Sequence, residues 1–495
     1  MTVGAMAAPS VEGPLGQRIG SGLLWSFLNN GVSRLGSFLV GIAMARLLVP
    51  EDFGVFAVGF VALSVMLSMN ELGVSLALVR RPGPVDGIAP TVATLALVWS
   101  GGLFAAMWLL APHIAAGAGS PEATGVLRLL AVGVLVDAVV AVPAALLMRA
   151  FLQRRKLAID LAAFCVSTPL SVGLALGGAG AWSLAWGVLA GSLVGGALTV
   201  LTAPGRCWPG WDLAAARELL AFGLPLAGTS LLLVVMLNVD YVVVSATLGS
   251  AALGLYVLAF NLCSWPVVLV STAVRRVSLA GFSRMEEQVD GAAEGFRRSW
   301  RLVLALTLPL SVLLACYAGD LIEFLYGSRW AAAAAVVPAL ALFGVARVLT
   351  ELSYDFLVAR GQTRVNLWLH ALWAVTLVPV LLVAAERGGL RGVAIGHGVV
   401  VLLVVLPVLA RVLRKAGVDV SGLCRDAAVP VAAAVLVVCS AVLVHAVLDA
   451  GPLRFLVGGG LGAVLYVAVV GPTLLGTWRA LTGPRAALGV DGARP

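Results

Sequence analysis

Apolar blocks of about twenty residues recur along the chain, separated by short segments rich in charged residues, proline and glycine. A helix of about 20 residues, rising about 1.5 Å per residue, spans a hydrocarbon core about 30 Å thick. The pattern therefore predicts an all-α polytopic membrane protein with about fourteen transmembrane helices. Their approximate bounds are 21–45, 53–79, 88–111, 123–149, 158–177, 181–203, 219–247, 251–274, 301–318, 333–358, 364–385, 392–413, 427–447 and 455–478.

A weak internal repeat divides twelve of these helices into two halves. Gly54 and Phe60, after the first turn, match Gly254 and Phe260, which lie two hundred residues later. Six helices separate the copies, an even number, so both halves run through the membrane in the same direction. Parallel repeats of this kind place the substrate site between them. We therefore expect two parallel six-helix bundles around a central cavity, followed by two extra C-terminal helices.

The basic residues orient this arrangement in the membrane. With the N-terminus inside, 24 of the 32 arginines and lysines fall in inner loops and tails, five in outer loops and three within helices. Cytoplasmic loops carry such an excess, so both termini are expected in the cytoplasm, with the chain in the inner (cytoplasmic) membrane. The expected segments are an N-terminal tail (1–20), the first bundle (21–203), a cytoplasmic connector (204–218), the second bundle (219–415), two additional helices (416–478) and a C-terminal tail (479–495).

The composition excludes a soluble protein. Hydrophobic residues make up 61% of the 495 positions and charged residues 11%, and the mean hydropathy is +1.05. Soluble domains carry roughly 25% charged residues. The net charge of +8 is spread over the loops rather than gathered on one domain, so no nucleic acid is expected as a partner.

Recognisable catalytic motifs are absent from the sequence. Neither lysine follows the glycine spacing of a phosphate loop, and there is no HExxH, no GxSxG and no metal-ligand cluster. We therefore expect no catalytic residue, metal or cofactor. The glycine spacings predict close helix contacts instead. These pairs are Gly173–Gly177, Gly191–Gly195, Gly392–Gly396 and Gly458–Gly462.

A family resemblance begins at the first turn. The string Ala-Arg-Leu-Leu-Val-Pro-Glu-Asp-Phe-Gly at 45–54 resembles the signature of Wzx-type polysaccharide flippases, which belong to the multidrug/oligosaccharidyl-lipid/polysaccharide (MOP) superfamily. Similar strings follow in order at 71–73, 238–241, 253–256, 282–284 and 325–330. The resemblance covers residues of about 20–365. It implies two six-helix bundles around a central cavity and the export of undecaprenyl-linked glycans.

Four groups of polar residues lie within the predicted helices. A charge at the centre of the membrane costs about 2.5–3.5 kcal/mol on insertion scales, so each needs a partner or a hydrated cavity. The groups are Asn30 and Arg34 on the first helix; Ser64, Ser68, Glu71 and Ser75 on the second; Asn238, Asp240 and Tyr241 on the seventh; and Arg347, Glu351, Tyr354 and Asp355 on the tenth.

Guanidinium groups suit phosphate, so Arg34 and Arg347 are the candidates for binding an anionic substrate. The candidates for binding hydroxyl groups are Asn30, Ser68, Asn238 and Tyr241. The candidates for ion coupling or ion pairing are Glu71, Glu351, Asp355 and Asp240. A simpler interpretation is that Glu351 pairs with Arg347 one turn away and Glu71 with Arg34 on the adjacent helix. Asp137 and His370 are expected to be packing residues.

The hypothesis that follows is a flippase. It would move a polyprenyl-pyrophosphate-linked oligosaccharide across the cytoplasmic membrane by alternating access, for extracellular polysaccharide or lipopolysaccharide biosynthesis. The expected partners are this lipid-linked substrate, membrane lipids, and a polysaccharide polymerase with its chain-length machinery. The alternatives are an ion-coupled multidrug (MATE-type) exporter, a lipid II flippase of the same superfamily and, less favoured, a membrane-embedded enzyme of polymer assembly.

Overall fold

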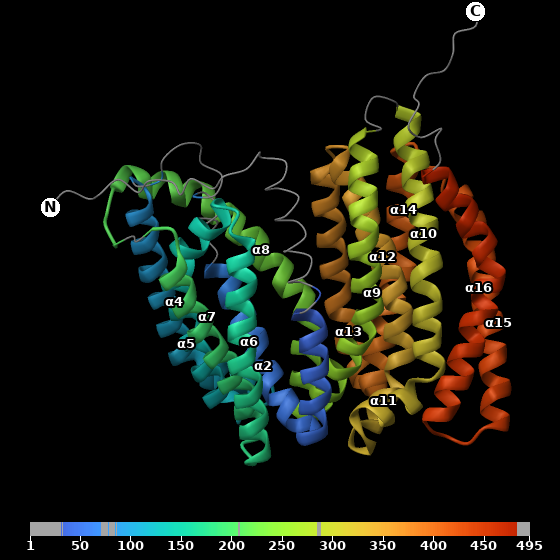
Figure 1. The fold of residues 1–495 in the computed structure, drawn as a ribbon, viewed down its shortest axis with the longest axis horizontal. Coiled ribbons are helices and arrows are strands. Elements are labelled where there is room, and N and C mark those ends of the chain that lie inside the picture. The colour runs from blue at the N-terminus through green and yellow to red at the C-terminus, as the bar shows by residue number, and fades with distance from the viewer. Residues whose placement is uncertain are drawn as a thin grey trace, which may run out of the picture. The chain divides into compact units, whose positions relative to one another are not determined.

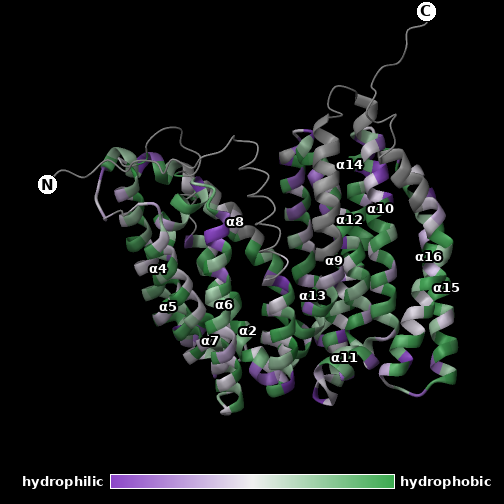
Figure 2. Cartoon of the chain, viewed as in Figure 1, coloured by the Kyte–Doolittle hydropathy of each residue, from purple (hydrophilic) through white to green (hydrophobic). Residues whose placement is uncertain are grey.

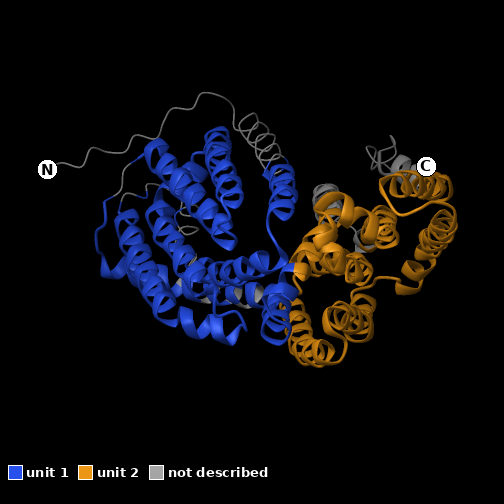
Figure 3. Cartoon of the chain, turned by 90° about the horizontal axis from the view of Figure 1, so that it is seen from below, with its two compact units in different colours: residues 1–254 blue, residues 255–495 orange. Residues whose placement is uncertain are grey.

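The protein is described here from a computed structural model, in which residues 31, 33–70, 78, 85, 87–205, 208–284 and 289–482 are placed. Every regular element in this part of the chain is a helix (Figure 1). Two compact units divide it, one of residues 1–254 and one of residues 255–495 (Figure 3). The predicted boundaries of the bundles and tails stay a prediction.

Eleven helices in the described part are long and apolar enough to cross a membrane. Hydrophobic residues cover most of the length of these helices (Figure 2). The segment Arg364–Lys415, at 52 residues, is long enough for two crossings. An apolar segment, Val234–Leu248, belongs to a further helix, and residues 33–47 of the first predicted span are helical. The chain is thus an all-α polytopic membrane protein.

The first unit contains six long helices, with residues 33–47 before them. They are α2 (Pro50–Asn70), α4 (Ala89–Gly117), α5 (Ala123–Arg149), α6 (Gln153–Leu176), α7 (Ala181–Thr202) and α8 (Leu213–Leu248). Apolar side chains of α4, α5 and α8, such as Val92, Leu146 and Leu219, form its largest described core cluster. Asp212 caps α8 by accepting hydrogen bonds from the backbone amides of Ala214 and Ala215.

The helix α9 (Ser250–Arg284) begins at the end of the first unit and continues into the second. The remaining helices are α10 (Val289–Cys316), α11 (Ala318–Tyr326), the 3₁₀ helix η1 (Ser328–Ala335), α12 (Val337–Ala359), α13 (Thr363–Val400), the π-helix η2 (Val401–Val405), α14 (Leu406–Lys415), α15 (Val420–Val447) and α16 (Pro452–Thr482). Their core cluster joins α10, α12, α15 and α16 through residues such as Leu308, Val345, Val437 and Tyr466.

Within α13 the chain reverses its direction at Gly389, whose φ of 54° and ψ of −144° are not helical. After this turn Gly392 lies against the carbonyl of Ala384, and Gly396 against Leu381. The segments before and after Gly389 therefore pack side by side as the two predicted spans 364–385 and 392–413. This close packing is the one that the spacing of Gly392 and Gly396 predicts.

The turn before α2 explains three residues of the family signature. Val49 is the last residue before the helix, and Pro50 occupies the first helical position, where its fixed φ fits and no amide is needed. The Asp52 carboxylate accepts a hydrogen bond from the Val49 amide (3.3 Å), which is the reverse half of a capping box. The same carboxylate accepts a second one from the Ala181 amide at the start of α7 (3.2 Å).

Gly54, the last residue of the signature, lies at a crossing of α2 with the first turn of α9. A Cβ atom at Gly54 would overlap the carbonyl of Ser250, and one at Gly254 would overlap the carbonyl of Pro50. The two glycines of the predicted repeat therefore meet, each allowing one helix to approach the backbone of the other. Both glycines are required by this contact rather than by a turn.

Next to this crossing of α2 and α9, the Glu122 carboxylate is hydrogen-bonded to Ser250, the first residue of α9. Burial alone would raise the pKa of Glu122, but its backbone amide and the hydroxyls of Ser120 and Ser250 hydrogen-bond the carboxylate. These bonds outweigh burial and hold the pKa of Glu122 below its usual value.

Replacing Gly54 with alanine is expected to lower the thermal stability of the protein. The added methyl group would overlap backbone atoms of Ser250, which no side-chain rotation relieves, and overpacking of this kind costs about 1–3 kcal/mol or more. Gly102→Ala in α4 is the matched control, because a Cβ there meets no atom within 4 Å. Thermal unfolding of both variants in detergent checks the prediction, and equal midpoints would contradict it.

Two ion pairs attach the C-terminal helices α15 and α16 to the rest of the second unit. Arg297 of α10 forms two hydrogen bonds to the Asp426 carboxylate of α15, at 2.6 and 3.0 Å. Arg454 of α16 forms two to Asp320 of α11, at 2.8 and 2.7 Å. The α15–α16 hairpin is thus attached at both ends, and it also contributes Val437 and Tyr466 to the core cluster of the unit.

Candidate functional site

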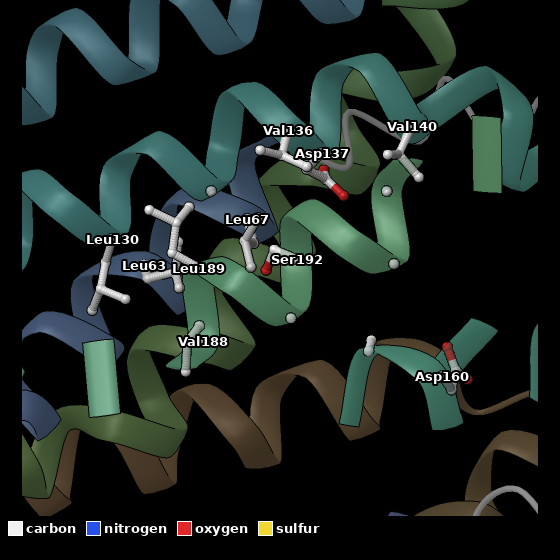
Figure 4. Close-up of a pocket in the computed structure, with 15 residues that line it drawn as sticks. Leu63, Leu67, Leu130, Val136, Asp137, Val140, Asp160, Val188, Leu189 and Ser192 are labelled. Atoms are coloured by element: carbon white, nitrogen blue, oxygen red, sulfur yellow. The ribbon is translucent and has the colours of Figure 1, made fainter. Parts of the chain in front are cut away.

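A cavity of about 340 Å³ lies inside the first unit, among helices α2, α5, α6 and α7. Most of its lining is apolar or glycine, with Leu63 and Leu67 from α2 and Gly191 and Gly195 from α7. Figure 4 shows two carboxylates at this cavity, Asp137 on α5 and Asp160 on α6, together with Ser192 on α7. Gly191 and Gly195 also pack against α6, as their spacing predicts.

Asp137 belongs to a chain of hydrogen bonds across three helices. The Asn70 amide of α2 donates to the Asp137 carboxylate at 2.7 Å, and the Ser100 hydroxyl of α4 donates to the Asn70 carbonyl oxygen. Ser100 is fully buried and Asn70 nearly so. A carboxylate in this position was expected to be a packing residue, but its contacts are polar and it borders the cavity.

No salt bridge to Asp137 is formed by the described residues, and its one hydrogen-bond partner there is the neutral Asn70 amide. Asp160, in contrast, pairs with Lys156 one turn earlier on α6, at 3.1 Å. An ionised carboxylate in a membrane-spanning helix without a cation costs about 2.5–3.5 kcal/mol on insertion scales. Asp137 is therefore the more unusual of the two acids.

In the second unit, Arg347 pairs with Glu351 one turn later on α12, with a distance of 3.0 Å between Nε and Oε1. This is the pair that the spacing of the two residues predicts. The guanidinium also lies 6.0 Å from the centre of the Phe260 ring of α9. Arg347 remains 27% exposed and Glu351 35% exposed, so the pair is accessible to a ligand or to solvent.

Two neighbouring residues of α12 differ in their surroundings. Asp355 is half-buried. Tyr354 is buried, and its ring lies 4.4 Å from that of His370 on α13. His370 hydrogen-bonds the backbone carbonyl of Asn366 through Nδ1 (2.9 Å) and so packs as expected.

The candidates on the first two helices are placed only in part. Arg34 is exposed on the helix 33–47, and Asn30, Glu71 and Ser75 lie outside the described residues. The proposed pairing of Arg34 with Glu71 is therefore untested. Ser64 donates to the carbonyl of Phe60, whereas the Ser68 hydroxyl is buried and finds no hydrogen-bond partner among the described residues.

Two candidates on α8, Asn238 and Asp240, form hydrogen bonds within their own helix. The Asn238 amide donates to the Val234 carbonyl (2.7 Å), and the buried Asp240 accepts from the Tyr241 amide (3.0 Å). Tyr241 is half-buried. The structure thus brings Arg347 and Glu351 together on α12, whereas the α8 group belongs to the first unit.

The chain of hydrogen bonds from Ser100 through Asn70 to Asp137 was not predicted from the sequence. Its members are separated by 30 and 67 positions, so no local spacing reveals it. The available signal was the presence of a carboxylate near the middle of an apolar helix. Such a residue is by default a functional candidate with a partner to be found.

Solved structures with a similar fold identify the architecture of the chain. The chain is similar to the lipid II flippase MurJ in an inward closed conformation, with a TM-score of 0.77 at 14% identity, over 92% of this chain and 100% of that chain. It is also similar to the inward-facing conformation of a multidrug resistance MATE family transporter of the MOP superfamily, with a TM-score of 0.59 at 17% identity, over 77% and 95% of the two chains. The fold is that of the polytopic transporters of this superfamily.

Residues 43–335, more than half of the chain, match the family described as polysaccharide biosynthesis protein, and the chain belongs to this family. It is 26% identical over 375 residues to the succinoglycan biosynthesis transport protein ExoT of Rhizobium meliloti, covering 74% of each chain. It is 26% identical over 152 residues to the teichuronic acid biosynthesis protein TuaB of Bacillus subtilis and spans about a third of the length of that relative (32%). The resemblance to the flippases is confirmed, and the relatives support a flippase or exporter role in polysaccharide biosynthesis.

Proposed function

We propose that the protein translocates a polyprenyl-pyrophosphate-linked oligosaccharide across the cytoplasmic membrane by alternating access, with both termini in the cytoplasm. The observation that carries the proposal is the family match over residues 43–335 in a chain with the fold of a lipid flippase. ExoT, which is named a succinoglycan transport protein, supports a polysaccharide precursor as the cargo.

The chemistry of such a cargo sets what the protein must supply. Each unpaired hydroxyl in hydrocarbon costs several kcal/mol, about 4–8 on the water-to-cyclohexane scale, and an anionic pyrophosphate costs more. Polar and cationic side chains exposed within the protein remove most of this cost. Arg347 is our candidate for the pyrophosphate, because its guanidinium is accessible and its partner Glu351 can release it to a stronger anion.

Arg34 is proposed for the same role in the first unit, where it is exposed. Ser68, Asn238 and Tyr241 are proposed for hydroxyl groups of the sugar, together with Asn30. Glu351, Asp355 and Asp240, with Glu71, are proposed to neutralise the arginines between cycles or to take up an ion. A polysaccharide polymerase and its chain-length machinery are the proposed partners on the outer face.

An ion-coupled multidrug exporter is the second candidate, since the MATE transporter shares the fold. The family match to polysaccharide biosynthesis favours the flippase, as does the accessible Arg347, which suits an anionic cargo rather than a cationic drug.

Depleting the protein in its own host is expected to abolish export of one cell-surface polysaccharide while its lipid-linked precursor accumulates. The sugar of that precursor should be inaccessible to an impermeant glycosidase added to intact cells. Hydrogen bonds to charged groups contribute about 1.5–3 kcal/mol, so Arg347→Ala should restore export at least about tenfold less well than the wild type, at about 1.4 kcal/mol per tenfold.

Arg329→Ala is the matched control, because Arg329 is exposed and lies outside the membrane-spanning helices. It should restore export fully at equal protein level. Unchanged polysaccharide with no accumulated precursor would reject the proposal, and loss of the precursor itself would indicate a biosynthetic enzyme.

A further inference from the structure

The strongest unexplained feature of the molecule is Asp137. It lies near the middle of α5, twelve residues before the end of that helix at Arg149, and borders the cavity of about 340 Å³. Among the described residues its side chain is contacted by an amide and by no cation. An ionised carboxylate is costly in these surroundings, and binding a proton would remove its charge.

We propose that Asp137 is a reversible proton-binding site, served by water in the cavity and held by Asn70 and Ser100. The proton comes from a hydronium ion of the cavity water and joins one oxygen of the carboxylate, which becomes a neutral carboxylic acid. The cavity has room for several water molecules, each of which takes up about 30 Å³ in the liquid.

The neighbouring amide suits both protonation states. With the ionised carboxylate, the Asn70 Nδ2 group donates to Asp137, and Asn70 Oδ1 accepts from Ser100. After proton uptake, a half-turn of the Asn70 amide lets Oδ1 accept from the new carboxylic acid. Nδ2 then donates to the Ser100 oxygen, because a hydroxyl both donates and accepts. Two hydrogen bonds are kept in each state, so the proton can bind and leave without an unsatisfied buried group.

In the described part of the neighbouring helices, the other titratable groups lie far from Asp137 along their helices or are paired. The ones on α2 are Glu51 and Asp52 in its first turn, far from Asn70 at its last residue. On α4 the one such group is His113, thirteen residues beyond Ser100, and α7 has none. On α6, Asp160 shares the cavity but is paired with Lys156.

The other basic groups of these helices lie near their ends. On α5 itself, Arg128 contacts Trp108 and Arg149 donates to the Leu78 carbonyl. On α6, Arg154 and Arg155 lie in the first turn, and Arg155 donates to the Thr202 carbonyl. Asp137 is therefore the group of this cavity whose charge is free to change.

Infrared difference spectra of the full-length protein in lipid nanodiscs test the proposal, with pH lowered in a sodium-free buffer. The wild type should gain the C=O band of a protonated carboxylic acid. Asp137→Asn should lose this band completely, and Asp160→Asn, the matched control, should keep it at wild-type amplitude. Ser100→Ala should shift the frequency of the band, since the orientation of Asn70 depends on that hydroxyl.

A second measurement uses the wild-type protein, so its result does not depend on whether Asp137→Asn folds. Dicyclohexylcarbodiimide, which attacks protonated carboxyls in apolar surroundings, should modify Asp137 of the wild-type protein increasingly as pH falls, as read by peptide mass spectrometry. A band that persists in Asp137→Asn, or a wild type with no band and no modification, would overturn the proposal. A band that sodium suppresses at constant ionic strength would overturn it in favour of a cation site. Neither measurement uses the transported lipid, so the outcome is independent of the proposed function.

Discussion

Replacing Asp320 with alanine is expected to lower the free energy of unfolding by about 3–5 kcal/mol. Asp320 is 2% exposed and Arg454 is 17% exposed, so the substitution leaves a largely buried guanidinium without its carboxylate. It also removes the acceptor of the Gly451 backbone amide, which donates to Asp320 at 2.9 Å. Because Gly451 and Arg454 lie at the start of α16, we expect the α15–α16 hairpin to detach first.

Thermal unfolding in detergent measures this effect, with Glu323→Ala as the matched control. Glu323 lies on the same helix as Asp320 but is exposed, so its removal should change stability by less than about 0.5 kcal/mol. Adding Arg454→Met to Asp320→Ala should recover part of the loss, because it removes the uncompensated charge. If the double variant is as unstable as the sum of the two single ones, the pair is not coupled as the structure indicates.

Much of the fold follows from the sequence, because backbone amides and carbonyls in the membrane must form their hydrogen bonds within the protein. Apolar blocks had to become helices, and the break around Gly389 had to separate two of them. The close contacts that Gly191 and Gly195 make with α6, and Gly392 and Gly396 with the segment before Gly389, were also predictable from spacing alone. The pair Gly173–Gly177 is the exception, since no atom lies within 4 Å of a Cβ placed at Gly173 and a Cβ at Gly177 meets only carbonyls of its own helix.

The ends of the helices were less predictable. The predicted spans 251–274 and 301–318 leave residues 275–300 between them, whereas α9 continues to Arg284 and α10 begins at Val289. A fall in hydropathy marks where a helix leaves the hydrocarbon, and it does not end the backbone hydrogen bonding. Polar residues such as glutamate and arginine are good helix formers in water.

The candidate site shows the same division between local and distant contacts. The pair of Arg347 and Glu351 follows from their separation of four residues on one helix. The contact of Asn70 with Asp137 depends instead on how α2 and α5 are rotated about their axes, which hydropathy does not determine. Sequence alone therefore favoured packing for Asp137, and the structure shows a polar network at a cavity.

Flipping by the purified protein tests most directly whether it moves a lipid-linked oligosaccharide through the membrane. Liposomes would carry the protein and a polyprenyl-pyrophosphate oligosaccharide with a fluorescent label on the sugar, and an impermeant quencher would be added outside. We predict that the quenched fraction rises with time from the outer-leaflet share to nearly all of the label in liposomes with wild-type protein. Arg347→Ala should slow this rise at least about tenfold, in keeping with the contribution of about 1.5–3 kcal/mol from a hydrogen bond to a charged group. A quenched fraction that stays at the outer-leaflet share, as in protein-free liposomes, would contradict the account.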